Sequence, residues 1–211
     1  MVLLLVLGLV AVGLAWADVQ ARAYAENEAR TRLARAVPQA RRTEVAITSF
    51  PFVGRILLGG DVERLTVTLH DLKEGKVEVD RVTLEVDDIV LDRDRLLDER
   101  VLSILDVGQV RIEGRITAEA ASRALGVPLE LRGGAARVTV QGQTLDASIS
   151  IAGRSVLLSV TGAPPLVVPL PPEKYLPCQP EVELTGDRLV VACSTTELPP
   201  AIMEVLGKGT G

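Results

Sequence analysis

The chain has 211 residues, of which 47% are hydrophobic and 2% aromatic, and its formal net charge is −5. This composition predicts a folded chain with an aliphatic core, and the scarcity of aromatic residues argues against the stacking platforms of single-stranded nucleic-acid binders. One histidine and two cysteines cannot form a Cys/His zinc site. We therefore expect no metal, no other cofactor and no nucleic-acid partner.

Residues 1–17 form an uninterrupted apolar segment without a charged side chain. Its length lies between that of a secretory signal core and that of a membrane-spanning helix. Ala15 and Ala17 match the small-residue pattern that signal peptidase recognises, although no Lys or Arg precedes them. The segment is predicted to be either a signal peptide, cleaved after Ala17, or a membrane anchor. Both alternatives place the remaining chain outside the cytoplasm, in the periplasm or cell envelope.

Residues 18–37 are rich in Ala, Arg and Glu and contain neither Gly nor Pro. Apolar residues, among them Tyr24, Ala29 and Leu33, recur every three or four positions before Pro38. This pattern predicts an amphipathic helix that ends before Pro38. Residues 18–60 also hold seven Arg and four acidic residues, so this part of an acidic chain is expected to approach an anionic membrane surface.

A two-residue alternation begins near residue 43 and predicts β-strands around residues 45–47, 65–69 and 77–91. A turn is expected at Glu74 and Gly75. The apolar positions change from odd to even numbers near Asp80 and Arg81, which predicts a bulge or bend there. Long strands with such changes are typical of a strongly curved sheet. His70 is expected at a strand end, where a structural role is favoured over a catalytic one.

The second half of the chain continues with short elements. A helix is predicted over residues 94–105, a strand around residues 110–116, and further strands over residues 138–160. Thr117 is the predicted N-cap of a helix that Gly126 ends. Residues 163–172 contain five prolines and cannot form a central strand, and residues 207–211 are expected to be a flexible tail.

Residues 182–193 alternate around Gly186 and Asp187, which predicts a β-hairpin. A turn at Thr185 and Gly186 would place Cys178 opposite Cys193, and a turn at Gly186 and Asp187 would make the cysteines diagonal neighbours. Opposed strand residues lie within disulfide range, so a bridge between Cys178 and Cys193 is predicted in an exported protein. Two buried thiols are the alternative.

Residues 50–60 contain both phenylalanines of the chain, followed by a run of Leu and Gly, with arginines close by. Such a segment suits the mouth of an apolar site at an anionic lipid surface, and the alternative is that the phenylalanines close one end of the core. The predicted lipid-contacting residues are Phe50, Phe52, Val53, Ile56, Leu57 and Leu58. The residues predicted to meet an anionic head group or membrane surface are Arg41, Arg42 and Arg55.

The sequence contains no G-x-S-x-G nucleophile motif, no phosphate-binding loop and no dinucleotide-binding glycine pattern after a strand. No pair of carboxylates is singled out for acid–base chemistry either. We therefore expect a protein that is not an enzyme.

Several of these features occur in a recognisable order. An export segment and an Ala/Arg helix precede the Phe-Pro-Phe sequence at residues 50–52, and the T-x-E-A helix at Thr117, a Leu-Pro-Pro stretch at residues 170–172 and a T-G-D-R-L-V-V hairpin follow. Over residues 18–206 the chain resembles the LmeA-like family of phospholipid-binding envelope proteins of actinobacteria. The resemblance implies a tubular lipid-binding (TULIP-like) fold, in which a curved sheet wraps a long helix around an apolar cavity. It also implies a role in lipoglycan maturation, and no catalytic residues.

The combined prediction is an α+β fold in which residues 18–206 form a single lipid-binding-like domain. A long N-terminal helix is expected to pack in a strongly curved, mostly antiparallel β-sheet around an apolar cavity. The predicted function is phospholipid binding, extending to transfer, at the outer side of the membrane. The alternatives are an envelope scaffold or accessory protein without a ligand cavity and, less favoured, an envelope hydrolase or transferase with convergent carboxylates in a cleft.

Overall fold

A computed structural model of the chain describes residues 2–74, 77–99, 101–160, 162, 164–170, 173, 176–200 and 202–203. These residues form an α+β fold, as the sequence predicts. The helices are α1 (Val2–Ala36), α2 (Phe52–Leu58), α3 (Ala118–Leu125) and the π-helix η1 (Arg95–Glu99). The strands are β1 (Arg42–Thr48), β2 (Asp61–Glu74), β3 (Val77–Leu91), β4 (Ile104–Asp106), β5 (Gln109–Thr117), β6 (Leu129–Arg132), β7 (Ala135–Val140), β8 (Gln143–Ala152), β9 (Ser155–Val160), β10 (Leu166–Pro169), β11 (Glu181–Thr185) and β12 (Arg188–Thr195).

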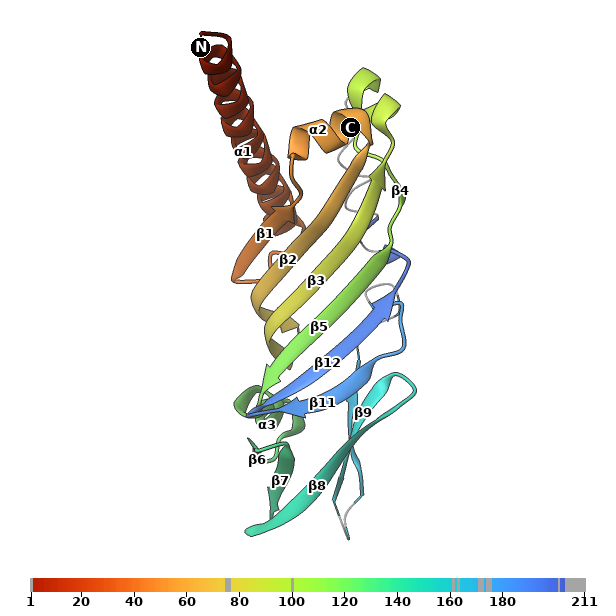
Figure 1. The fold of residues 1–211 in the computed structure, drawn as a ribbon. Helices are drawn as coiled ribbons and strands as arrows, with labels where there is room; N and C mark the ends of the chain where they lie inside the picture. The colour runs from red at the N-terminus through yellow and green to blue at the C-terminus, as the bar shows by residue number, and fades with distance from the viewer. Residues whose placement is uncertain are drawn as a thin grey trace.

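The strands form two antiparallel sheets in an elongated molecule (Figure 1). The larger sheet has the order β1-β2-β3-β5-β12-β11, with β4 paired to the end of β3. The smaller sheet has the order β10-β9-β8-β7-β6 and lies at the end of the molecule remote from α1. Neither sheet is strongly curled in the described residues. The antiparallel organisation is therefore confirmed, and the division into two sheets is a feature that the sequence did not indicate.

Helix α1 continues without a break from the apolar segment into the predicted amphipathic helix. Ala21 and Ala25 pack against the protein core, whereas Tyr24 is exposed. The helix ends at Ala36, shortly before Pro38, whose missing N–H cannot continue a helix. It packs against β1 and α2 at one end of the molecule and does not lie along the larger sheet. No helix in the described residues is both long enough and apolar enough to cross a membrane.

The β2–β3 hairpin keeps a single register from the Asp61–Val90 pair to the Glu74–Val77 pair, so no residue is inserted near Asp80. The irregularity there is the left-handed backbone of Asp71, which has a φ of 51° and lies level with Asp80. Asp88 has a φ of 52° where the apolar positions return to odd numbers. Left-handed residues interrupt the two-residue alternation, and aspartate tolerates this conformation better than most residues.

His70 differs from its prediction. It lies within β2, which continues to Glu74, so it is not at a strand end. Its Nε2 is 3.6 Å from the Glu44 carboxylate of the neighbouring strand β1, where Arg42 is paired with His70 in the register. The residue therefore belongs to the polar face of the larger sheet.

Helix α3 forms where its end signals predict. Thr117 Oγ1 accepts a hydrogen bond from the Ala120 amide at 3.2 Å, and Gly126 ends the helix with a φ of 71°. The N-cap and the left-handed C-cap are both interactions within a few residues, which is why the sequence reveals them.

Other predictions are confirmed in part. The helix predicted over residues 94–105 ends at Glu99, and residues 104–106 form β4 instead. The proline-rich stretch contributes β10, which is an edge strand and therefore accommodates Pro169. Strand β6 was not predicted. The tail predicted at residues 207–211 lies outside the described residues.

The buried apolar side chains form two separate clusters, named here the upper core and the lower core after their places in Figure 1. The upper core lies under α1, α2 and the upper half of the larger sheet, and it contains Phe52, Val62, Val86, Ile89, Leu91, Val107, Val110, Ile112, Leu176, Cys178 and Cys193. The lower core joins α3 and the smaller sheet to β12, and it contains Ala121, Leu129, Leu131, Ala136, Val138, Leu158, Val160 and Leu189.

Candidate functional site

The Phe-Pro-Phe segment leads directly into α2 at the upper end of the molecule. Phe52 is 7% exposed and belongs to the upper core, whereas Phe50 is 66% exposed. The buried carboxylate of Asp18 on α1 accepts hydrogen bonds from the amides of Phe52 at 3.0 Å and Val53 at 2.7 Å. These two bonds satisfy the first N–H groups of α2 and fix α2 against α1. The two phenylalanines therefore face different surroundings.

The remaining predicted lipid contacts also divide between core and surface. Val53 and Ile56 pack against the upper core. Leu57 and Leu58 are exposed on the outer side of α2, Leu58 at 84%. The segment is therefore divided between the upper core and the surface, and its exposed members form part of the upper surface of the molecule.

The three predicted head-group arginines are not brought together. Arg55 hydrogen-bonds the Asp61 carboxylate through Nε at 2.7 Å and also pairs with Glu63, and the Asp61 bond raises the pKa of Arg55. Arg41 and Arg42 lie at the start of β1, which separates them from α2 by roughly 20 Å of strand. Arg41 and Arg42 are exposed and remain the candidates for contact with an anionic surface.

The disulfide between Cys178 and Cys193 is present, with the two Cα atoms 5.7 Å apart. Thr185 pairs with Arg188, so the hairpin turn is at Gly186 and Asp187, the alternative in which the cysteines are diagonal neighbours. The bridge lies in the upper core and joins β12 to the chain that precedes β11.

The inner face of the larger sheet forms an apolar surface between the two cores. Residues paired across strands lie on the same face of a sheet, so the register defines rows of neighbouring side chains. One row contains Val67, Leu84, Ile112 and Cys193, and the next contains Leu69, Val82, Gly114, Val191 and Val182. A third row, with Ile116, Leu189 and Leu184, reaches the lower core. The apolar face is therefore continuous along the molecule.

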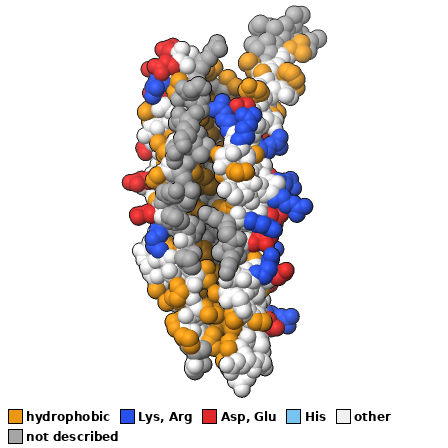
Figure 2. Space-filling view, turned by 180° about the vertical axis from the view of Figure 1, so that it is seen from behind, with side chains coloured by type: hydrophobic (Ala, Val, Ile, Leu, Met, Phe, Trp, Pro, Cys, Tyr) orange, Lys and Arg blue, Asp and Glu red, His pale blue; other side chains and the backbone are white. Residues whose placement is uncertain are grey.

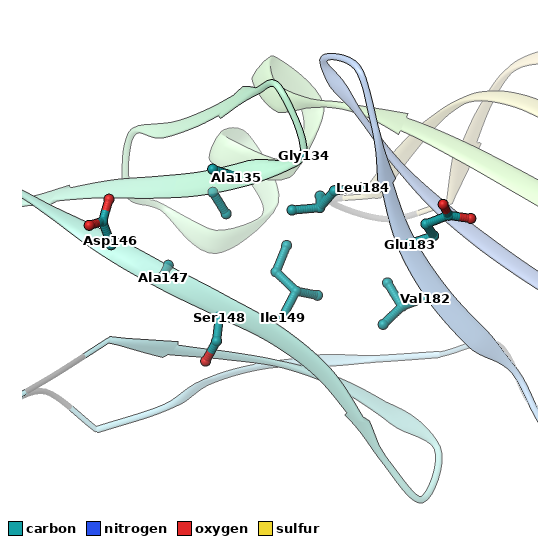
Figure 3. A pocket seen from close by; sticks show the side chains of 10 residues that line it. Gly134, Ala135, Asp146, Ala147, Ser148, Ile149, Val182, Glu183 and Leu184 are labelled. Atoms are coloured by element: carbon teal, nitrogen blue, oxygen red, sulfur yellow. The ribbon is translucent and has the colours of Figure 1, made fainter.

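An open cleft of about 440 Å³ lies at the lower end of this face, between β8 of the smaller sheet and the edge strand β11 of the larger sheet (Figure 3). Ile149, Val182 and Leu184 point into the gap from the two strands, whereas Glu183 and Ser148 point away from it. The cleft is lined by Gly134, Ala135, Ala136, Asp146, Ala147, Ser148, Ile149, Val182, Glu183 and Leu184. Its volume is in the range typical of small-molecule sites.

The two acidic residues beside the cleft are exposed to water. Asp146 is exposed and pairs with Arg137 on the neighbouring strand, with 3.1 Å between Arg137 Nε and the carboxylate. Glu183 is also exposed. Hydrophobic side chains gather at this lower end of the molecule in Figure 2. The arrangement suits an amphipathic ligand whose apolar part enters the gap and whose polar part stays at the water-exposed rim.

Sequence reasoning missed this cleft. Val182 and Leu184 alternate on an edge strand, and Ala147 and Ile149 alternate on β8, but more than 30 residues separate these two pairs along the chain. No sequence pattern indicates that two such strands meet. Among the described residues, no group of three or more His, Cys, Asp or Glu side chains could hold a metal ion.

Comparison with known proteins identifies a family. A family model described as LmeA-like phospholipid-binding matches residues 16–200 of the chain. This range includes all the strands described above, together with the part of α1 that packs on the core. No curated protein and no solved structure matches the chain.

Proposed function

The chain belongs to the LmeA-like phospholipid-binding family, and from this premise we propose that it binds phospholipid without chemical conversion, with the acyl chains in the cleft between β8 and β11. The observation that carries the proposal is the open cleft itself, because Ile149, Val182 and Leu184 enter it from two sheets while the charged group of Glu183 points away from it. Phospholipid has the same division into apolar chains and a polar head.

The inner face of the larger sheet extends this site. Each methylene group that leaves water contributes about 0.8 kcal/mol, so an aliphatic surface binds acyl chains without special polar groups. From Val110 to Ile116 on β5 the face is roughly 20 Å long. One leaflet of a bilayer is about 15 Å of hydrocarbon, half of the core thickness. The face therefore offers enough length for an acyl chain, and we propose it as the wall of an apolar cavity that continues from the cleft.

The proposed setting is the cell envelope, outside the cytoplasmic membrane, where the protein would exchange phospholipid with membranes. Arg41 and Arg42 support an anionic membrane as a partner because they are exposed and lie in the basic part of an otherwise acidic chain. Binding and transfer of lipid use the same site, and residues 18–206 are proposed to act as one lipid-binding domain.

The proposal is tested by filling the cleft. Ala147→Phe places a ring among Ile149, Val182 and Leu184, and Ala152→Phe at the end of β8 is the matched control because Ala152 does not line the cleft. We expect Ala147→Phe to weaken binding of a fluorescent short-chain phospholipid about tenfold or more, and Ala152→Phe to leave it unchanged. Thermal unfolding checks that both variants are folded. Unchanged lipid binding by folded Ala147→Phe would place the lipid elsewhere.

A further inference from the structure

The exposed large hydrophobic side chains are concentrated at the upper end of the molecule. Of the fifteen found in the described residues, twelve lie on three elements: the N-terminal half of α1, α2 with its preceding residue, and the end of β3 with its connection through β4. These twelve are Leu9, Val12, Leu14, Trp16, Val19, Phe50, Leu57, Leu58, Val90, Leu97, Leu102 and Leu105. A protein surface normally carries such residues singly, so this concentration indicates an interaction surface.

The three elements are held side by side. Asp18 binds the first amides of α2 and so fixes the base of the projecting part of α1 beside it. Gly60, just after α2, accepts a hydrogen bond from the Leu91 amide at 2.6 Å, and β4 pairs with Val90 and Leu91. Figure 1 shows all three elements at the same end of the molecule, opposite the smaller sheet. We call this surface the upper tip.

The form of the upper tip fits a lipid surface better than a protein partner. Residues 11–17 of α1 are all exposed and none is charged, so this stretch is apolar around its whole circumference. A helix that binds a protein groove presents one apolar face, whereas a helix apolar on all sides requires apolar surroundings on all sides. Trp16 is 67% exposed, and its ring suits the level of lipid head groups.

The arginines of the upper tip lie in pairs in the part of the chain that the structure describes. Arg55 pairs with Asp61 and Glu63, Arg95 lies 3.2 Å from the Glu99 carboxylate, and Arg93 lies 3.9 Å from the Asp94 carboxylate. Neutralised arginines contribute little attraction to anionic lipid. The upper tip therefore relies on apolar contact.

We propose that the upper tip inserts into a phospholipid bilayer, with the exposed residues of α1, α2 and the β3–β4 connection as the inserted groups. This inference rests on the proposed function, since both involve phospholipid, and it names a second surface at the opposite end from the cleft (Figure 1). Docking by the upper tip keeps the cleft away from the docked membrane, so that the cleft faces a second membrane that could accept the lipid. α2 and the β3–β4 connection contribute whether or not residues 1–17 are retained.

The test uses the full chain and vesicles of phosphatidylcholine, which carry no net charge. Trp16 is the single tryptophan, so its emission reports insertion directly. We expect the emission to shift to shorter wavelength on addition of vesicles, with the shift retained in about 1 M NaCl, where the Debye length is about 3 Å. Leu57→Ser combined with Leu58→Ser should lower vesicle partitioning about tenfold or more. Val167→Ser, an exposed valine outside the upper tip, is the control.

The same variants separate docking from lipid binding. In solution with a short-chain phospholipid and no vesicles, the Leu57 and Leu58 variant should bind lipid like the parent chain, whereas Ala147→Phe should lose lipid and still dock on vesicles. The docking proposal is overturned if the Leu57 and Leu58 variant partitions like the parent, if Val167→Ser is equally impaired, or if the Trp16 signal is abolished by salt. Loss of lipid binding by Ala147→Phe, with docking unchanged, supports the cleft as the lipid site and leaves the docking proposal unaffected.

Discussion

The upper and lower cores share the larger sheet but are held together by different kinds of contact. In the upper core the contacts join distant parts of the chain: the Asp18 carboxylate binds the amides of Phe52 and Val53, and Cys178 is bridged to Cys193. In the lower core the strands from β6 to β10 pair with their neighbours in sequence, and neither cysteine is present. The smaller sheet meets the edge strand β11 across an open cleft.

This difference separates a fixed end from an adaptable one. Long-range hydrogen bonds from the amides of α2 to the Asp18 carboxylate hold α1 and α2 together. The cleft borders few cross-sheet contacts, and regions with few buried contacts open at low free-energy cost. A lipid-binding protein needs such an opening where its ligand enters. If the two cores differ in this way, matched substitutions in them should have unequal effects.

Phe52→Ala is expected to have the largest effect on stability. Truncating this buried ring in the upper core should lower the free energy of unfolding by ~3–5 kcal/mol. Phe50→Ala removes an exposed ring and should change it by less than about 0.5 kcal/mol. Urea denaturation followed by far-ultraviolet circular dichroism measures both values. Similar losses in the two variants would contradict the assignment of Phe52 alone to the upper core.

Replacement of Cys178 and Cys193 by serine should have the next largest effect. The bridge spans a sequence separation of 15, for which the loss of chain entropy on cross-linking corresponds to about 3 kcal/mol. Hydrogen exchange should accelerate at the β12 amides next to Cys193 more than at the β7 amides of the lower core. Equal acceleration in both places would show that the two cores unfold as one unit and would remove the distinction.

Val110→Ala and Val138→Ala form a matched pair, because each valine is fully buried in one of the cores. Val110→Ala should destabilise the fold by about 2 kcal/mol. Val138→Ala should cost less, because the lower core borders the cleft and can close around the missing methyl groups. The midpoints of urea unfolding give the comparison. A loss for Val138→Ala that equals or exceeds that for Val110→Ala would show that the lower core is equally rigid.

Asp18→Asn should have a smaller effect, about 1 kcal/mol, since it weakens the two bonds that cap α2. Exchange of the Phe52 and Val53 amides should accelerate, and the thermal midpoint should fall. Asp94→Asn is the control because Asp94 is exposed and its carboxylate accepts no backbone hydrogen bond in the described residues. If both variants melt alike, the Asp18 carboxylate does not hold α1 to α2.

Arg41→Gln combined with Arg42→Gln should leave stability nearly unchanged, because both arginines form only exposed pairs. Binding to vesicles rich in anionic phospholipid should weaken several-fold at low salt, and the difference should disappear at high salt. Cosedimentation at two salt concentrations measures this. Weakening that is independent of salt would contradict an electrostatic role.

The sequence was informative wherever a structure depends on neighbouring residues. Thr117 and Gly126 mark the ends of α3, Pro38 follows the end of α1, and the alternation around Gly186 predicts the hairpin that brings Cys193 near Cys178. Each of these is an interaction between residues close together in the chain, so side-chain size, capping and backbone freedom decide it.

Tertiary packing decided the rest, because it selects which distant surfaces meet. Phe50 and Phe52 are two positions apart, so in an extended segment both rings would lie on the same side of the chain. The hydrogen bond to the Asp18 carboxylate instead fixes the start of α2 at Phe52, which is buried, whereas Phe50 is exposed. Arg42 and Arg55 are near in sequence, but Arg42 begins β1 and Arg55 lies in α2, beyond the other end of that strand. The cleft arises only where β8 approaches the uncovered edge of β11, a meeting of distant strands that no local propensity determines.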